Sequence, residues 1–168
     1  MNDKKILREL IKKTLEIANQ DIQKKRRKLW EDFNSLENTK VPVFILDPIN
    51  MYREVFDSNT LQCEDPFYRS YEFWLIHQMY HASFGDDFII EPWLTIRPTY
   101  KNNIPNWTMW GIANQTENID ETNSYHYQDG IFKNRDNLKK LVLPMDEIDE
   151  IKTNQTYDKI HDAVGDLI

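Results

Sequence analysis

The segment from Cys63 to Trp93 constrains the fold more than any other part of the sequence. It contains Asp65-Pro66, and Asp is a favoured N-cap residue while Pro is favoured at the first helical position, where its missing N–H costs nothing. Gly85 is a residue type that commonly ends helices. The sequence therefore predicts a helix that starts at Pro66 and stops at Gly85. Its expected apolar face comprises Phe67, Tyr71, Trp74, Leu75 and Gln78.

Three further stretches are predicted to be strands because β-branched and aromatic residues dominate them. They are Val41–Leu46, Phe88–Ile96 and Trp107–Ile112. A short apolar run of this kind is typical of a buried strand, and Pro92 indicates an edge or a bulge in the second. The polar composition of Asn114–Asn123 predicts a loop.

Short helices are expected in three other places. Asp47-Pro48 repeats the cap-and-proline signal and predicts a helix through Val55, and a second short helix is expected from Asn134 to Leu141. In the last segment Thr153 is a candidate cap and Gly165 a candidate stop. The apolar residues at helical spacing there are Tyr157, Ile160, Ala163 and Val164.

The N-terminal segment Asp3–Leu36 predicts one long helix or two in tandem, because no proline interrupts it. An apolar residue recurs every seven positions at Leu15, Ile22, Leu29 and Leu36. Such a seam must be covered, either by a second subunit or by the rest of the same chain. Lys25 and Asp32 interrupt the seam, which argues against a sustained coiled coil but is compatible with both alternatives. The second alternative is favoured.

These elements predict an α+β fold, with a long N-terminal helix and C-terminal helices around a small mixed β-sheet. The expected division is a helical segment over residues 1–38 and an α+β domain over residues 39–168. At 168 residues the chain is long enough for one ordinary domain with a hydrophobic core.

Charge and cysteine content exclude several classes of function. A formal net charge of −7 argues against a broad nucleic-acid surface, which requires many lysines and arginines. The one basic run, Lys24–Lys28, is interpreted as a solvated face of a helix. The single cysteine, Cys63, excludes an intrachain disulfide, and no apolar run resembles a membrane span. A cytoplasmic location is expected.

His77 and His81 are the strongest candidates for metal ligands, because residues four apart in a helix share one face. A third ligand is required, and the candidates of suitable chemistry are Asp86, Asp87, Glu91, His126 and Cys63. There is no HExxH motif, since Gln78 follows His77. The alternative is that one histidine packs among aromatic side chains while the other binds a loop.

Two other groupings of side chains are weaker candidates for a site. Asp86-Asp87 with Glu91 have the chemistry of an acid–base pair, but a helix-to-strand turn also favours Asp for local hydrogen bonds. Cys63 precedes two acidic residues that would raise its pKa, which argues against a nucleophile. A pocket for a flat ligand is the hypothesis for the aromatic residues Trp93, Tyr100, Trp107 and Trp110.

Taken together, several stretches resemble the N-terminal region of uroporphyrinogen-decarboxylase-like proteins, which are relatives of cobalamin-dependent methyltransferases. The pieces that carry the resemblance are Arg27–Trp30 with Asn34–Leu36, Glu64–Pro66, Asp86-Asp87 followed by Ile90–Pro92, and the tail with Asp149-Glu150, Thr153 and Gly165–Ile168. The resemblance implies a chain that precedes a (β/α)₈ barrel. Barrel active sites are assembled from loops after several strands, which a chain of this length does not supply.

The resemblance does not extend to the catalytic motifs of that family. The arginine-rich motif that grips porphyrin carboxylates is missing, since Arg97 stands alone beside Pro98, and no His-x-Cys zinc motif occurs. The resemblance therefore implies a non-catalytic N-terminal region that covers or completes a barrel, or that pairs subunits, with any corrinoid or zinc in the parent protein. The alternatives are a small metal-dependent enzyme or metal-binding domain centred on His77 and His81, and an acidic interaction module that uses the first helix.

Overall fold

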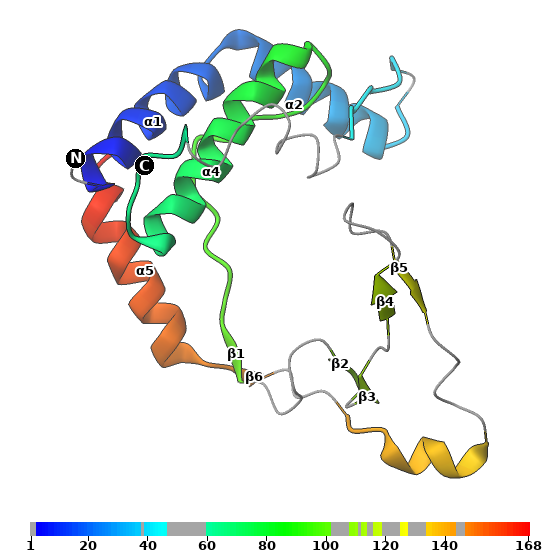
Figure 1. Cartoon of the computed structure of the whole chain (residues 1–168). Helices are drawn as coiled ribbons and strands as arrows, with labels where there is room; N and C mark the ends of the chain where they lie inside the picture. Colours follow the sequence, from blue (N-terminus) through cyan, green and yellow to red (C-terminus); the bar gives the residue numbers. More distant parts are fainter. Residues whose placement is uncertain are drawn as a thin grey trace. The chain divides into compact units, whose positions relative to one another are not determined.

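A computed structural model describes residues 3–37, 39–46, 60–101, 108–110, 112–113, 116–118, 125–127, 134–143 and 147–168. The chain forms two compact units, Met1–Ile96 with Tyr157–Ile168 and Arg97–Thr156. The division at residue 38 that the sequence suggests stays a prediction. Helices occur towards both ends, with short antiparallel strands between them, which confirms the predicted α+β class (Figure 1). Among the described residues, the helices of the first unit are α1 (Asp3–Ala18), α2 (Asp21–Asn34), α4 (Pro66–His81), the 3₁₀ helix η2 (Ala82–Phe84) and the C-terminal part of α5 (Glu150–Val164).

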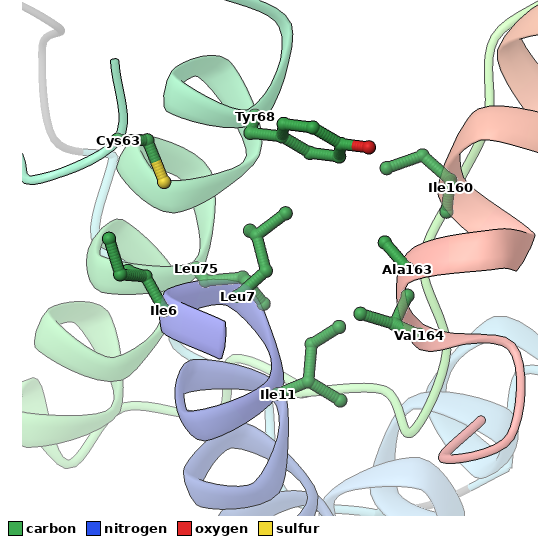
Figure 2. Packing of buried hydrophobic residues seen from close by; sticks show 9 residues of the cluster. All are labelled: Ile6, Leu7, Ile11, Cys63, Tyr68, Leu75, Ile160, Ala163 and Val164. Atoms are coloured by element: carbon green, nitrogen blue, oxygen red, sulfur yellow. The ribbon is translucent and has the colours of Figure 1, made fainter. Parts of the chain in front are cut away.

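The hydrophobic core of the first unit lies between α1, α4 and the end of α5. In Figure 2, Leu7 and Ile11 of α1 lie opposite Ile160 and Val164 of α5. Burying each such aliphatic side chain stabilises the fold by roughly 1.5–3 kcal/mol. The buried cluster consists of Ile6, Leu7, Ile11, Cys63, Tyr68, Leu75, Ile160, Ala163 and Val164.

The N-terminal segment forms two helices in tandem, as one of the two alternatives predicted. The backbone of Gln20 is extended, with φ −67° and ψ 148°, and separates α1 from α2. The predicted seven-residue seam is wrong: Ile22 is 45% exposed and Leu36 is 93% exposed. The break resets the helical phase, so residues counted across it do not fall on one buried face. The buried residues of α2 are Gln23 and Arg26, both polar.

Helix α4 begins where local signals predicted but ends at His81, and the predicted stop at Gly85 lies after the 3₁₀ helix η2. The Asp65 carboxylate accepts a hydrogen bond from Phe67 N–H, and Pro66 occupies the first turn. Gly85 has a φ of 72°, the left-handed conformation that favours glycine, and it ends η2 directly after α4. The predicted apolar face is partly wrong, because Trp74 is exposed. The most buried residues of the helix are Tyr68, Glu72, Leu75 and His81.

The two strands predicted in the first unit are not formed. Val41–Leu46 and Phe88–Ile96 belong to no sheet, although Ile90 is fully buried and Leu94 packs on the core. A physical reason is that side-chain carboxylates, and not the backbone of a neighbouring strand, accept the N–H groups of Val43 and Ile45. The prediction of a buried strand at Val41–Leu46 was therefore wrong in burial as well, since five of its six side chains are exposed.

The second unit contains antiparallel strand pairs. Trp107–Ile112 was predicted as one strand, but Trp110 has a φ of 56° and lies between two short strands that pair with each other. Asn114–Asn123 was predicted as a loop but contains a paired strand. The pairs are β1 (Tyr100–Lys101) with β6 (Glu147–Ile148), β2 (Thr108–Met109) with β3 (Ile112–Ala113), and β4 (Thr116–Asn118) with β5 (Tyr125–Tyr127).

The predicted helix from Asn134 to Leu141 is present as a 3₁₀ helix, η3 (Arg135–Lys140), whose cap is the side chain of Asn134. The predicted helix from Asp47 to Val55 lies outside the described residues.

The last helix, α5, buries Ile160, Ala163 and Val164 as predicted, while Tyr157 is exposed. It starts earlier than the candidate cap Thr153, whose hydroxyl oxygen instead accepts a hydrogen bond from Thr99 N–H. It ends before Gly165, where a Cβ would lie 2.5 Å from His161 Cδ2, so only glycine fits without a shift.

Candidate functional site

The polar side chains that the sequence singled out meet where α4 ends and the Asp86-Asp87 pair follows. One oxygen of Asp86, Oδ2, lies 3.0 Å from His81 Nε2 and accepts a hydrogen bond of 2.8 Å from Ile45 N–H. The other oxygen, Oδ1, accepts from Phe88 N–H at 3.2 Å. Both side chains of the His81–Asp86 pair are almost completely buried. The pair therefore joins the end of α4 to two separate backbone segments.

The charge state of Asp86 follows from these contacts. Burial raises the pKa of the carboxyl group, but the hydrogen bonds from Ile45 N–H, His81 and Phe88 N–H outweigh it and hold the pKa below its ordinary value. An ionised carboxylate only accepts hydrogen bonds, so His81 Nε2 carries a proton and donates. This arrangement is a structural anchor, because both oxygens of Asp86 accept hydrogen bonds from other groups of the same chain.

Aromatic rings enclose the imidazole of His81. Phe88 stacks on it with a centroid distance of 4.0 Å, and Phe44 stacks at 5.4 Å. Phe84 is tilted against it at 5.0 Å, and the His77 ring meets it edge-on at 6.4 Å. His81 therefore combines the two roles that the packing alternative divided between two histidines: it lies among phenylalanine rings and binds the carboxylate of Asp86.

Asp87, the residue after Asp86, also binds the exposed segment Val41–Leu46. Its Oδ2 accepts from Val43 N–H at 2.9 Å, and its own N–H donates to the Val43 carbonyl at 2.8 Å. The bond from Val43 N–H lowers the pKa of Asp87, and the ammonium group of Lys40 at 3.2 Å lowers it further. Asp86 and Asp87 together therefore fix the Val41–Leu46 segment through the alternate residues Val43 and Ile45.

The buried side of α2 is held by hydrogen bonds to the chain between Asp87 and Glu91. Gln23 Oε1 accepts from Ile90 N–H at 3.0 Å, and Trp30 Nε1 donates to the Asp87 carbonyl at 2.7 Å. Arg27 forms an ion pair with Glu91 at 2.8 Å and also donates to the Ile90 carbonyl. Polar contacts of this kind replace the apolar seam that the sequence predicted.

The predicted metal ligands are His77, His81, Asp87 and Glu91, and they are not brought together as one group. His81 binds Asp86, Asp87 binds Val43 N–H and Lys40, and Glu91 binds Arg27. The His77 ring stacks near Phe73. Within the described part of the chain, no three His, Cys, Asp or Glu side chains are placed to hold a metal ion. The metal-binding alternative stays a prediction.

The four aromatic residues of the predicted ligand pocket belong to different units. Trp93 lies in the first unit, whereas Tyr100 and Trp110 lie in the second, and Trp107 lies outside the described residues. Trp93 lines an apolar groove of about 220 Å³. The other lining residues of this groove are Leu94, Ile96, Tyr157, Ile160, His161, Gly165 and Ile168. The aromatic ligand pocket as a whole remains a prediction.

Cys63 has the environment of a structural cysteine. Its side chain is buried, and burial, followed by the carboxylate of Glu72, raises the pKa of the thiol to about 12. The thiol is therefore protonated at neutral pH and a poor nucleophile, as predicted. Glu72 itself accepts hydrogen bonds of 2.8 Å from Gln62 N–H and Cys63 N–H. Sequence reasoning missed this buried glutamate, because a helical Glu is normally exposed.

Comparisons of the chain with protein-family models, with curated proteins and with solved structures found no match. A separate search of the described residues found no helix of the length and apolar character needed to cross a membrane.

Proposed function

We propose that the chain acts by binding and not by catalysis, as the N-terminal region of a larger protein that resembles the uroporphyrinogen-decarboxylase-like proteins. In this role it covers or completes a barrel, or it pairs subunits. Any corrinoid or zinc belongs to the rest of that protein, and the proposed location is the cytoplasm.

One observation supports binding over catalysis: the best candidate catalytic carboxylates hold an apolar segment at the surface. Asp86 and Asp87 accept backbone N–H groups from Ile45 and Val43. A general acid or base needs an oxygen within reach of a substrate, but these oxygens are directed at the protein's own backbone. Their arrangement supports a role as anchors for the segment.

The anchored segment has the composition of an interaction surface. The side chains of Val41, Val43, Phe44, Ile45 and Leu46 are all exposed, and Leu46 is 85% exposed. Exposed apolar residues that occur singly are normal, but a contiguous group is typical of a contact with another protein surface. The segment is therefore a surface that another folded part is expected to cover.

The gene sequence tests whether a larger protein exists. We expect the reading frame to continue past the codon for Ile168 and to encode alternating strands and helices. A stop codon at that point would contradict the proposal that this chain precedes a barrel.

An activity assay tests the absence of catalysis in this chain. The purified chain is expected to show no decarboxylation of a porphyrinogen and no methyl transfer from a methylated corrinoid. Turnover of either substrate class that Asp86→Asn abolishes would overturn the proposal, provided that circular dichroism shows the variant to be folded.

A further inference from the structure

Arg26 is a buried cation on the inner face of α2. Its side chain is 7% exposed, yet in the part of the chain that the structure describes no group accepts a hydrogen bond from its guanidinium. Asp87 forms its ion pair with Lys40. Glu91 forms its ion pair with Arg27. Removing a charge from water costs free energy unless an opposite charge binds it. An anionic ligand would satisfy Arg26.

Gln23, three residues before Arg26, also has a donor without an acceptor. Its Oε1 accepts a hydrogen bond of 3.0 Å from Ile90 N–H, which fixes the orientation of the amide. Its Nε2 is buried and has no partner among the described residues. Residues three apart are neighbours on the surface of a helix. The buried face of α2 therefore carries two neighbouring side chains that lack acceptors, which favours an anion over a cation.

A groove of apolar side chains lies at the same end of the first unit's polar contacts. It is lined by Trp30, Phe44, Phe88 and Ile89, and its volume is about 370 Å³. Small-molecule sites usually have a volume of roughly 300–1,000 Å³ and combine an apolar lining with a few polar groups. Three of the four lining side chains are aromatic, so the groove suits a flat ring.

Three observations place Arg26 beside this groove. Trp30 follows Arg26 by four residues, and side chains at that spacing are neighbours on a helix. Trp30 Nε1 donates to the Asp87 carbonyl at 2.7 Å, and Asp87 directly precedes Phe88 in the groove lining. The bond from Val43 N–H is the main cause of the lowered pKa of Asp87, and the positive charge of Arg26 contributes to it. The guanidinium is therefore near the same residue that Trp30 binds.

We propose that this groove binds a small aromatic carboxylate, with its ring among the aromatic side chains and its carboxylate on the Arg26 guanidinium. A guanidinium presents two parallel N–H donors that match the two oxygens of a carboxylate. Aromatic side chains stack favourably on a flat ring. The Asp87 carboxylate is close by, but its own ion pair offsets its repulsion of a second anion. This site goes beyond the proposed barrel role and does not depend on it.

Equilibrium dialysis with two naphthalene probes of the same shape tests the proposal. Naphthoate carries a carboxylate, and naphthamide is its uncharged counterpart. The wild-type chain is expected to bind naphthoate about tenfold or more tightly than naphthamide, because hydrogen bonds between charged groups are the stronger ones. Arg26→Met should reduce this preference to less than about threefold. Lys24→Met is the matched control, because it removes a well-exposed cation from the same helix, and it should leave the preference unchanged.

Variants of the two grooves locate the bound ring. Phe44→Ala should weaken both probes by about fivefold or more and leave their ratio unchanged, since it removes apolar contact area but no charge. Trp93→Ala truncates an aromatic side chain of the other apolar groove and is the control. It should leave both affinities within about twofold of wild type.

Thermal melting distinguishes a ligand site from a structural role of Arg26. Without a probe, Arg26→Met should melt no lower than wild type, because the buried guanidinium has no partner to lose. A variant that melts much lower, or that does not fold, would show that Arg26 is bound within the chain and would overturn the proposal. Three results in dialysis would also overturn it: no binding of naphthoate at millimolar concentration, equal affinities for the two probes, or equal losses in Trp93→Ala and Phe44→Ala.

Discussion

Helices α1 and α2 follow one another directly, yet they are held in place by different forces. The inner face of α1 is apolar and packs its Leu7 and Ile11 against α4 and α5. The inner face of α2 is polar. Its Gln23, Arg27 and Trp30 bind the segment between Asp87 and Glu91. Hydropathy alone therefore locates the buried face of the first helix but not of the second.

The largest effect is expected from truncating the apolar face of α1. Leu7→Ala removes a fully buried side chain and leaves a cavity, which should lower the free energy of unfolding by about 2–5 kcal/mol. Leu36→Ala makes the same chemical change at a residue that is 93% exposed, and should change it by less than about 0.5 kcal/mol. Urea denaturation measures both variants. Equal losses would show that α1 does not pack as described.

Next in size is the loss of the buried anchor Asp86. Asp86→Asn removes the charge that accepts from His81, Ile45 and Phe88, and should cost about 1–3 kcal/mol at pH 7. The pKa of Asp86 is lowered in the folded state, so its stabilisation is fully present above the ordinary value of about 3.9. As the pH falls below that value and through the lowered pKa, the stabilisation is lost. The gap between wild type and variant in urea melts should therefore narrow below about pH 4, and a constant gap would contradict the assignment.

A smaller effect is expected from the polar face of α2. Arg27→Met removes the ion pair with Glu91 and the bond to the Ile90 carbonyl, and should cost about 1–2 kcal/mol, since the pair is only partly buried. Lys24→Met on the same helix breaks the well-exposed pair with Asp21 and is the matched control. That control should stay within about 0.5 kcal/mol of wild type in chemical denaturation. If both variants lose the same amount, the contacts to Ile90 and Glu91 do not hold α2.

The smallest effect is expected at a residue that the seven-residue seam placed in the interior. Ile22 is 45% exposed, so Ile22→Asp should change the free energy of unfolding by no more than about 0.5 kcal/mol. If the seam were buried, Ile22→Asp would bury an unpaired charge and lower the free energy of unfolding by several kcal/mol. Thermal melting at a fixed protein concentration separates the two expectations. A large loss of stability would place Ile22 back in a buried contact.

Sequence reasoning succeeded where the controlling residues are close together in the chain. Asp65, Pro66 and Gly85 fix the ends of α4 and its extension through backbone geometry and local hydrogen bonds. The buried positions of α5 were also predicted, because its apolar spacing is continuous. In these cases the residues that determine the helix ends and the buried face lie within one or a few helical turns of each other.

Prediction failed where a backbone segment is satisfied by distant side chains. Val41–Leu46 has the composition of a buried strand, but the partners of Val43 and Ile45 are carboxylates 44 and 41 residues away. The same limit applies to the carboxylate pair: Asp86 and Asp87 were recognised as notable residues, but their partners Ile45 and Val43 were not. Composition shows which groups need partners, and only the fold shows which partners they find.

Contacts between α1 and the C-terminal part of α5 are among the last that the first unit can form as it folds. Arg8 binds Asp166 at 2.5 Å across a separation of 158 residues, and Leu7 and Ile11 share their core with Ile160 and Val164. Contacts so distant in sequence slow folding, because the loop between them must close first. At typical rates of translation, α5 is synthesised roughly ten to thirty seconds after α1, so the apolar face of α1 lacks these partners during that time. Chaperone capture of the nascent chain is therefore relevant at α1, whose apolar face emerges well before its partners on α5.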